Sequence, residues 1–114
     1  GYGCFHYYNP MQQVGGDYFD YIQLPDGKIA IVVADVTGHG IAAAMFMAKV
    51  SAETRFALGS EDDPARAITL LNRRLARLMV ERFVTMIVTI LDPLTGKVVT
   101  VNAGHMPPIL RRAK

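Results

Sequence analysis

The chain has 114 residues, 51% of them hydrophobic and 19% charged, and a formal net charge of +2. This composition indicates one folded domain with a modest core and excludes a disordered segment. The small net charge predicts no nucleic-acid partner, and no apolar run approaches the roughly 18 residues that span a bilayer, so no membrane segment is predicted.

The N-terminal part of the chain predicts three β-strands. Residues 1–9 are rich in aromatic side chains and stop at Asn9-Pro10, which predicts a first strand. A second strand is predicted from Val14 to Leu24, and the turn signal Pro25-Asp26-Gly27 leads into a third, Lys28 to Asp35. The hairpin turn predicts that the second and third strands pair antiparallel.

The single cysteine, Cys4, excludes an internal disulfide and predicts a reducing, cytoplasmic location. Because aromatic residues flank it in the first predicted strand, we expect a buried structural thiol. His6 in the same stretch is interpreted as a strand side chain and not as a metal ligand.

Two of the predicted strands carry an aspartate next to a glycine or a glycine-rich loop. Asp17 follows Gly15-Gly16 near the start of the second strand, and Asp35 ends the third. Antiparallel pairing would bring both acids to one end of the sheet. Converging carboxylates repel each other unless a cation neutralises them, and hard oxygen ligands suit Mg²⁺, Mn²⁺ or Ca²⁺. The pattern therefore predicts a metal site, with a helix-capping role for Asp35 as the purely structural alternative.

The loop after Asp35 contains Gly38, His39 and Gly40, which we predict to contact the loop's ligand or substrate. The two glycines let the backbone turn sharply and approach a bound group. His39 is placed either to contact the loop's ligand or an outer-sphere water of a metal, or simply to fit the loop, and both interpretations stay open.

Two helices are predicted after this loop. The first, Gly40–Leu58, is apolar on nearly every side and has small early residues, which predicts a helix buried between layers and packed closely on the second. The second begins at Asp63-Pro64 and follows an apolar stripe to about Glu81. A solvated face is the preferred interpretation of its arginines, and a surface for an acidic partner is the alternative. These arginines are Arg66, Arg73, Arg74 and Arg77.

The C-terminal part predicts three more strands. Val84 to Asp92 and Lys97 to Asn102 flank a turn, and Ile109-Leu110 begins a last short strand. His105, between a glycine and two prolines, is interpreted as a turn residue and not as a catalytic base. The order β-β-β-α-α-β-β-β predicts an α+β fold with a helical hairpin packed on antiparallel sheet.

Three segments together resemble the SpoIIE/RsbU-like bacterial branch of the PPM-type, metal-dependent serine/threonine protein phosphatases. They are VGGDYFDY from Val14, ADVTGHGIAAAMFMA from Ala34, and NAGHMPP from Asn102. The resemblance covers essentially the whole chain. It implies that residues 1–114 are the N-terminal, incomplete portion of a phosphatase domain, that the sheet belongs to a four-layer αββα sandwich, and that the family's last metal-binding acids would follow Lys114.

The resemblance also implies a two-metal site for Mn²⁺ or Mg²⁺ that activates a water against a phosphoserine or phosphothreonine. By motif, Asp35 matches the bridging ligand and Asp17 the acid of the first motif, so these two are the catalytic candidates. Val36 matches a position that supplies a carbonyl ligand, where many relatives have glycine. Asp20 could support the metal ligands from behind or be simply a strand acid outside the site, and the second interpretation is preferred.

A phosphoprotein substrate is implied, usually a STAS-domain anti-anti-sigma protein in bacterial signalling. The alternative is a catalytically incomplete module that docks its partner through the two helices. A small-ligand domain that cradles a phosphate ranks last, because the chain lacks the lysine-bearing loop of nucleotide-binding proteins. Helices or exposed strand edges are expected to support a homodimer.

Overall fold

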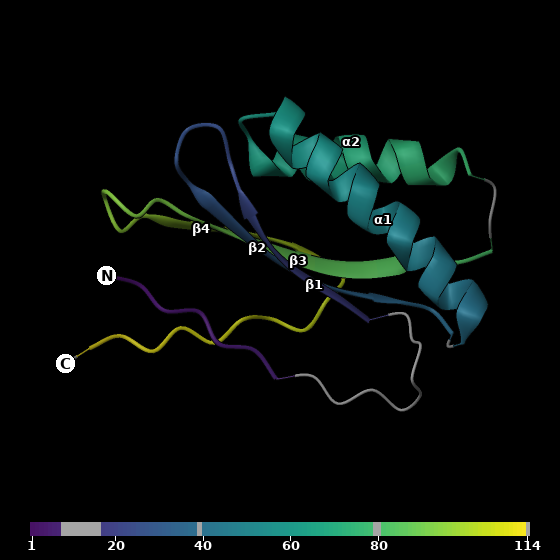
Figure 1. The fold of residues 1–114 in the computed structure, drawn as a ribbon, viewed down its shortest axis with the longest axis horizontal. Coiled ribbons are helices and arrows are strands. Elements are labelled where there is room, and N and C mark those ends of the chain that lie inside the picture. The colour runs from purple at the N-terminus through teal and green to yellow at the C-terminus, as the bar shows by residue number, and fades with distance from the viewer. Residues whose placement is uncertain (8–16, 39, 79–80, 114) are drawn as a thin grey trace.

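A computed structural model describes residues 1–7, 17–38, 40–78 and 81–113 of the chain. The described elements are β1 (Asp17–Gln23), β2 (Ile29–Val36), α1 (Ile41–Ser60), α2 (Pro64–Ala76), β3 (Val84–Leu91) and β4 (Val98–Ala103). The strands form an antiparallel sheet in the order β1-β2-β3-β4, and both helices cover the same face of it (Figure 1). The α+β prediction is confirmed.

The β1–β2 hairpin forms where the turn signal predicted it. Gly27 N–H donates to Leu24 O at 3.1 Å, and Leu24 N–H donates to Lys28 O at 2.9 Å. Gly27 has a φ of 82°, a conformation that side-chain-bearing residues rarely adopt. The turn sets the register in which Gln23 faces Ile29 at one end and Asp17 faces Asp35 at the other.

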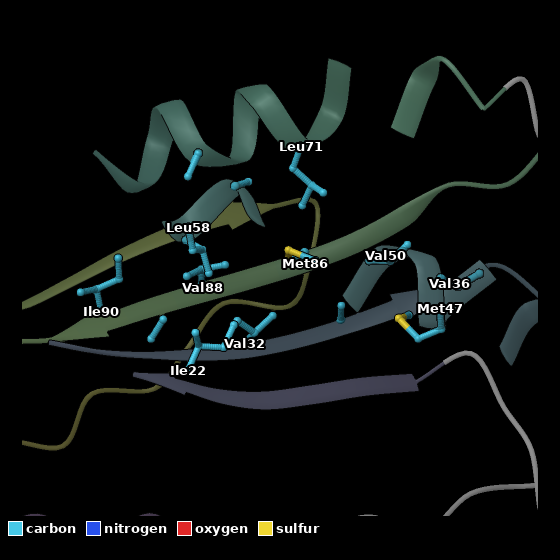
Figure 2. Packing of buried hydrophobic residues seen from close by; sticks show 14 of the residues in the cluster. Ile22, Val32, Val36, Met47, Val50, Leu58, Leu71, Met86, Val88 and Ile90 are labelled. Atoms are coloured by element: carbon cyan, nitrogen blue, oxygen red, sulfur yellow. The ribbon is translucent and has the colours of Figure 1, made fainter. Parts of the chain in front are cut away.

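The core fills the space between the helices and the face of the sheet that they cover (Figure 2). Along β2, Ala30, Val32, Ala34 and Val36 alternate onto this face and are buried, as the period of a strand requires. The one buried hydroxyl of the helix layer, that of Thr54, donates to Val50 O at 2.7 Å, so it is satisfied within its own helix.

The first helix is not buried between layers as predicted. Ile41 and Met45 on its outer side are 71% and 70% exposed, because among the described elements only one sheet face lies against it. The second helix begins as predicted, with Asp63 Oδ1 accepting from Ala65 N–H at 2.9 Å, but it ends at Ala76 and not near Glu81.

An ion pair joins the two helices, which corrects the solvated interpretation of Arg74. The Arg74 guanidinium binds the nearly buried carboxylate of Glu53 and lies 4.4 Å from the centre of the Phe56 ring. Lys49 also reaches Glu53 at 3.3 Å. Arg66, Arg73 and Arg77 remain exposed as expected.

Two predicted strands are wrong where the structure describes them. Residues 1–7 form no strand and are exposed, so Cys4 is an exposed thiol and not a buried one. Ile109 and Leu110 are also outside any strand, because Pro107-Pro108 removes two backbone donors just before them. Residues 8–16 of the first and second predicted strands lie outside the described residues. No helix of the described segments combines the length and apolar character needed to cross a membrane.

Candidate functional site

The two predicted acids face each other at one end of the sheet. Asp17 is the first residue of β1, and the register pairs it directly with Asp35 on β2. Ile22 and Ala34 point into the core, so the alternation of a strand turns both aspartates to the face that the helices leave open. The structure therefore brings together the two carboxylates that the sequence singled out.

The environment of this pair resists negative charge. Burial raises the pKa of Asp17 above its ordinary value, and a hydrogen bond shared with Asp35 and the charge of Asp35 raise it further. The nearby His105 acts in the opposite direction and lowers it. Two facing carboxylates repel each other unless a cation lies between them, so the pair favours cation binding.

The donors present fit the chemistry of Mg²⁺ or Mn²⁺. Both carboxylates are hard oxygen ligands, and Mg²⁺ is commonly held by one or two carboxylates while it keeps several waters. The Val36 side chain is buried in the core, which leaves its main chain as the only part that can serve a ligand. Since Thr37 N–H donates to Phe83 O on the β3 side, Val36 turns its own carbonyl to the β1 side, where Asp17 lies. Within the segments that the structure describes, no cluster of three or more His, Cys, Asp or Glu side chains forms.

Asp35 does not cap the helix that follows it. The residue before α1 is Gly40, with a φ of 85°, and no side chain of the described residues forms a capping hydrogen bond at the helix start. The structural alternative for Asp35 is thus excluded. Gly38 also has a positive φ, 89°, as the sharp turn of the loop requires. His39 lies outside the described residues.

Thr37 is bound firmly to the segment before β3. Its N–H donates to Phe83 O at 3.0 Å, its Oγ1 accepts from Phe83 N–H at 3.2 Å, and its carbonyl accepts from Arg82 Nη1 at 2.7 Å. These bonds continue the β2–β3 pairing beyond the strand ends. They hold the start of the glycine loop against a segment that is distant in sequence.

His105 and Thr85 belong to the same end of the sheet, although the sequence analysis assigned neither to the site. Thr85 faces Asp35 in the β2–β3 register, and its Oγ1 is 2.9 Å from His105 Nδ1. Asn102 holds the His105 backbone through two bonds, accepting from its N–H at 2.8 Å and donating to its carbonyl at 2.9 Å. His105 is therefore a turn residue, and this turn also brings its ring to the acids. The spacing of Asn102 and His105 in the NAGH segment is the signal that could have indicated this.

Asp20 lies outside the site, as interpreted. It accepts a hydrogen bond from Tyr18 OH at 2.6 Å and one from Arg55 Nη2 at 2.6 Å, which ties β1 to α1. Burial and the bond to Asp20 raise the pKa of Tyr18. This cluster fixes the strand that carries Asp17 without facing the acids.

A groove of about 470 Å³ leads from the acids along the open face of the sheet. Its walls come from the N-terminal segment, from β1 and β2, and from the turn after β4. Its floor is largely apolar, and the His6 ring lies 4.5 Å from the Phe19 ring within it. A second cavity, of about 490 Å³, lies at the opposite end of the sheet, between the β1–β2 turn, the α1–α2 connection and the β3–β4 turn.

Comparison with known proteins gives consistent matches. Residues 25–114 match the family model of Stage II sporulation protein E (SpoIIE). Phosphoserine phosphatase RsbP of Bacillus subtilis is 27% identical over 108 residues, which cover 90% of this chain and 27% of that protein. Protein IcfG of a Synechocystis species is 45% identical over 40 residues, 35% of this chain and 6% of that protein.

Among solved structures, the RsbU and RsbW domains of Rv1364c from Mycobacterium tuberculosis match with a TM-score of 0.73 and 30% identity. This match covers 85% of the present chain and 27% of the solved one. The sheet of four strands with two helices on one face thus occurs in that structure. The chain spans 27% of the length of RsbP and 27% of the Rv1364c chain.

Proposed function

The chain belongs to the SpoIIE family of PP2C-type phosphatase domains, RsbP- and RsbU-like, and from this we propose that it forms part of a metal-dependent serine/threonine phosphatase. The proposed reaction is hydrolysis of a phosphoserine or phosphothreonine on a regulatory protein. The observation that carries the proposal is the facing pair Asp17 and Asp35 at the open end of the sheet.

Different residues of this chain would bind the metal and position the loop in such a reaction. Asp17, Asp35 and the Val36 carbonyl would hold the cofactor, and Mn²⁺ or Mg²⁺ bound there would supply an acidified water and neutralise phosphate charge. Asp17 and Asp35 would repel a phosphate by themselves, so they make substrate binding depend on the cofactor. The Thr37 bonds to the segment before β3 keep the loop with Gly38 and Gly40 beside the acids. A loop held in advance loses little entropy when substrate binds.

We further propose that the open face of the sheet is covered by a second sheet in a four-layer αββα sandwich, of which residues 1–114 are the N-terminal portion. Phe19, Tyr21 and Val33 point to this face and are 38%, 37% and 41% exposed. A sheet with one solvated face normally carries polar residues there, whereas these residues suit burial on both faces. The substrate proposed from the family is a STAS-domain regulatory protein in the bacterial cytoplasm.

The test is the substitution Asp35→Ala in the full-length protein, with Asp26→Ala as the matched control. Asp26 is an exposed acid in the β1–β2 turn, at the opposite end of the sheet. Phosphate release from a phosphoserine protein in Mn²⁺ should fall by at least a hundredfold in Asp35→Ala and stay at the wild-type rate in Asp26→Ala. Circular dichroism should show the same fold in all three proteins.

Full activity of Asp35→Ala would remove this residue from the mechanism. A second candidate function is a docking module, which the exposed apolar residues Ile41 and Met45 on the outer side of α1 favour. In that case the wild type would bind the phosphoprotein without releasing phosphate, and Ile41→Lys would weaken the binding while Asp35→Ala would not.

A further inference from the structure

Arg82 reaches from the segment before β3 to the loop that follows Asp35. Its Nη1 donates to the carbonyl oxygen of Thr37 at 2.7 Å. Phe83, the next residue, exchanges two hydrogen bonds with the same threonine. The guanidinium is therefore held over the glycine loop at the end of the sheet where the two aspartates lie, and it is half-buried.

Gly38 provides the room for this contact. A Cβ built on Gly38 would lie 2.8 Å from Arg82 Nη1, closer than real Cβ atoms approach a neighbour. The loop therefore has no side chain where the guanidinium lies. Glycine therefore suits this position for two reasons: it leaves space for the guanidinium, and it readily adopts the positive φ of 89°.

The charge of Arg82 has no carboxylate partner among the described residues. Two other arginines that join separate elements do have one: Arg55 binds Asp20 and Arg74 binds Glu53. Arg82 instead binds a neutral carbonyl through one nitrogen. A guanidinium has five N–H donors, so most of its donors and its full charge remain for an anion.

We propose that Arg82 binds the phosphoryl group of the substrate; this rests on the proposed phosphatase function. A planar guanidinium fork fits phosphate oxygens through two parallel hydrogen bonds. The site otherwise presents two carboxylates, which attract the cofactor and repel the substrate. Arg82 supplies a fixed positive charge from the protein itself, which attracts the phosphate that the two carboxylates repel. It is placed by the loop itself and does not need to be ordered when the substrate arrives.

A purely structural role predicts different behaviour. If Arg82 only braces the loop, then breaking another brace should have the same effect as removing Arg82. Thr37→Val removes the hydroxyl that accepts from Phe83 N–H and leaves the guanidinium in place. Arg73→Gln removes one charge from the exposed side of α2 and controls for net charge.

The experiment uses the full-length protein with Mg²⁺ or Mn²⁺. It measures kcat and KM for a phosphoserine peptide, the inhibition constant of inorganic phosphate, and the Mn²⁺ concentration for half-maximal activity. Arg82→Gln should raise KM and the phosphate inhibition constant roughly ten- to a hundredfold, as expected for a lost hydrogen bond to a charged group. The Mn²⁺ requirement should stay within about twofold. Arg82→Lys should recover part of the loss, Thr37→Val should weaken phosphate binding less than Arg82→Gln does, and Arg73→Gln should leave phosphate affinity unchanged.

Calorimetric titration of inorganic phosphate into the Mg²⁺-containing protein provides a measurement that does not need turnover. Phosphate affinity of Arg82→Gln within about twofold of wild type would overturn the inference. An equal loss of phosphate affinity in Thr37→Val and Arg82→Gln would show that Arg82 only holds the loop in place and does not bind phosphate. If Arg82→Gln fails to fold, unchanged phosphate affinity in Arg82→Lys overturns the inference, because a lysine cannot reproduce the two-bond contact. If the wild type binds phosphate through Arg82 but hydrolyses no phosphoprotein, the proposed function fails, and only the assignment of Arg82 as a phosphate-binding residue remains.

Discussion

At the scale of single residues, Asp17 shows how the candidate site lowers the stability of the fold. Its pKa is raised in the folded chain, so its folded form prefers to be protonated. The corresponding stability is present below the ordinary pKa near 3.8 and is lost as pH rises through the raised value. At neutral pH the two facing carboxylates therefore lower the free energy of unfolding of the metal-free protein.

Asp17→Asn should consequently raise the melting temperature of the metal-free protein at pH 7 and have little effect at pH 3. The amide keeps the shape of the side chain and removes the repulsion with Asp35. The same substitution should abolish the gain in melting temperature that Mn²⁺ gives the wild type. Thermal melts at both pH values, with chelator and with Mn²⁺, check both expectations.

Asp26→Asn is the control for that experiment, since this exposed turn residue is at the other end of the sheet. It should leave the response to Mn²⁺ unchanged. A metal-free Asp17→Asn protein that melts below the wild type at pH 7 would show that the facing acids do not repel each other.

At the scale of elements, α1 links the loop beside the acids to the rest of the helix layer. The sequence analysis attributed close packing to the small residues of its early turns as a group, but the structure separates them. Ala43 is fully buried, whereas Ala48 is exposed. Both stand on the same helix, and only Ala43 can transmit a change of packing.

Ala43→Leu should therefore weaken Mn²⁺ binding several-fold, while Ala48→Leu should bind as the wild type does. The added atoms at Ala43 must displace neighbours in a close-packed core, at a cost of about 1–3 kcal/mol, and the helix start shifts with the loop. The measurement is an Mn²⁺ titration of the full-length protein, with a thermal melt to confirm the destabilisation. If Ala43→Leu melts lower yet binds Mn²⁺ normally, packing of α1 does not reach the site.

Elements with strong local signals were predictable from the sequence, and elements that depend on a neighbour were not. The turn at Gly27 and the start of α2 at Asp63-Pro64 follow from local backbone chemistry. Residues 1–7 and Ile109-Leu110 have strand-like composition but form no strand. Aromatic and branched residues favour a pleated, half-buried surface, and composition does not reveal whether a partner strand is present.

The same distinction applies to the site. Asp17 and Asp35 could be placed together because a single hairpin turn sets their register. Thr85 and His105 join the site through the β2–β3 pairing and the turn after β4, and Arg82 reaches the loop after Asp35 from the segment before β3. No local pattern reports contacts between segments so far apart, so the sequence identified the acids and missed the residues around them.

At the scale of the whole molecule, the open face of the sheet should govern self-association of residues 1–114 produced alone. Exposed apolar residues on a sheet face favour contact between copies, and so do the outer edges of β1 and β4, which pair with no other strand in the described part of the chain. Val33→Lys should therefore lower the concentration-dependent association that sedimentation velocity measures.

Ile41→Lys makes the same chemical change on the outer side of α1 and serves as the comparison. It should leave association unchanged if the sheet face is the interface. If instead Ile41→Lys disperses the protein and Val33→Lys does not, the copies meet through their helices.

The pairing of β2 with β3, which we call the central seam of the sheet, also determines the order in which the candidate site can assemble as the chain folds. Each outer hairpin, β1–β2 and β3–β4, closes over a short turn and forms early, whereas β2 and β3 meet only after both helices between them have collapsed. The two aspartates lie within the first hairpin and can pair in a nascent chain. The Thr37 bonds to Arg82 and Phe83 cross the seam and form last. A ribosome-bound chain would thus possess the facing acids well before the loop beside them is fixed, so the candidate site should be completed in the final folding step.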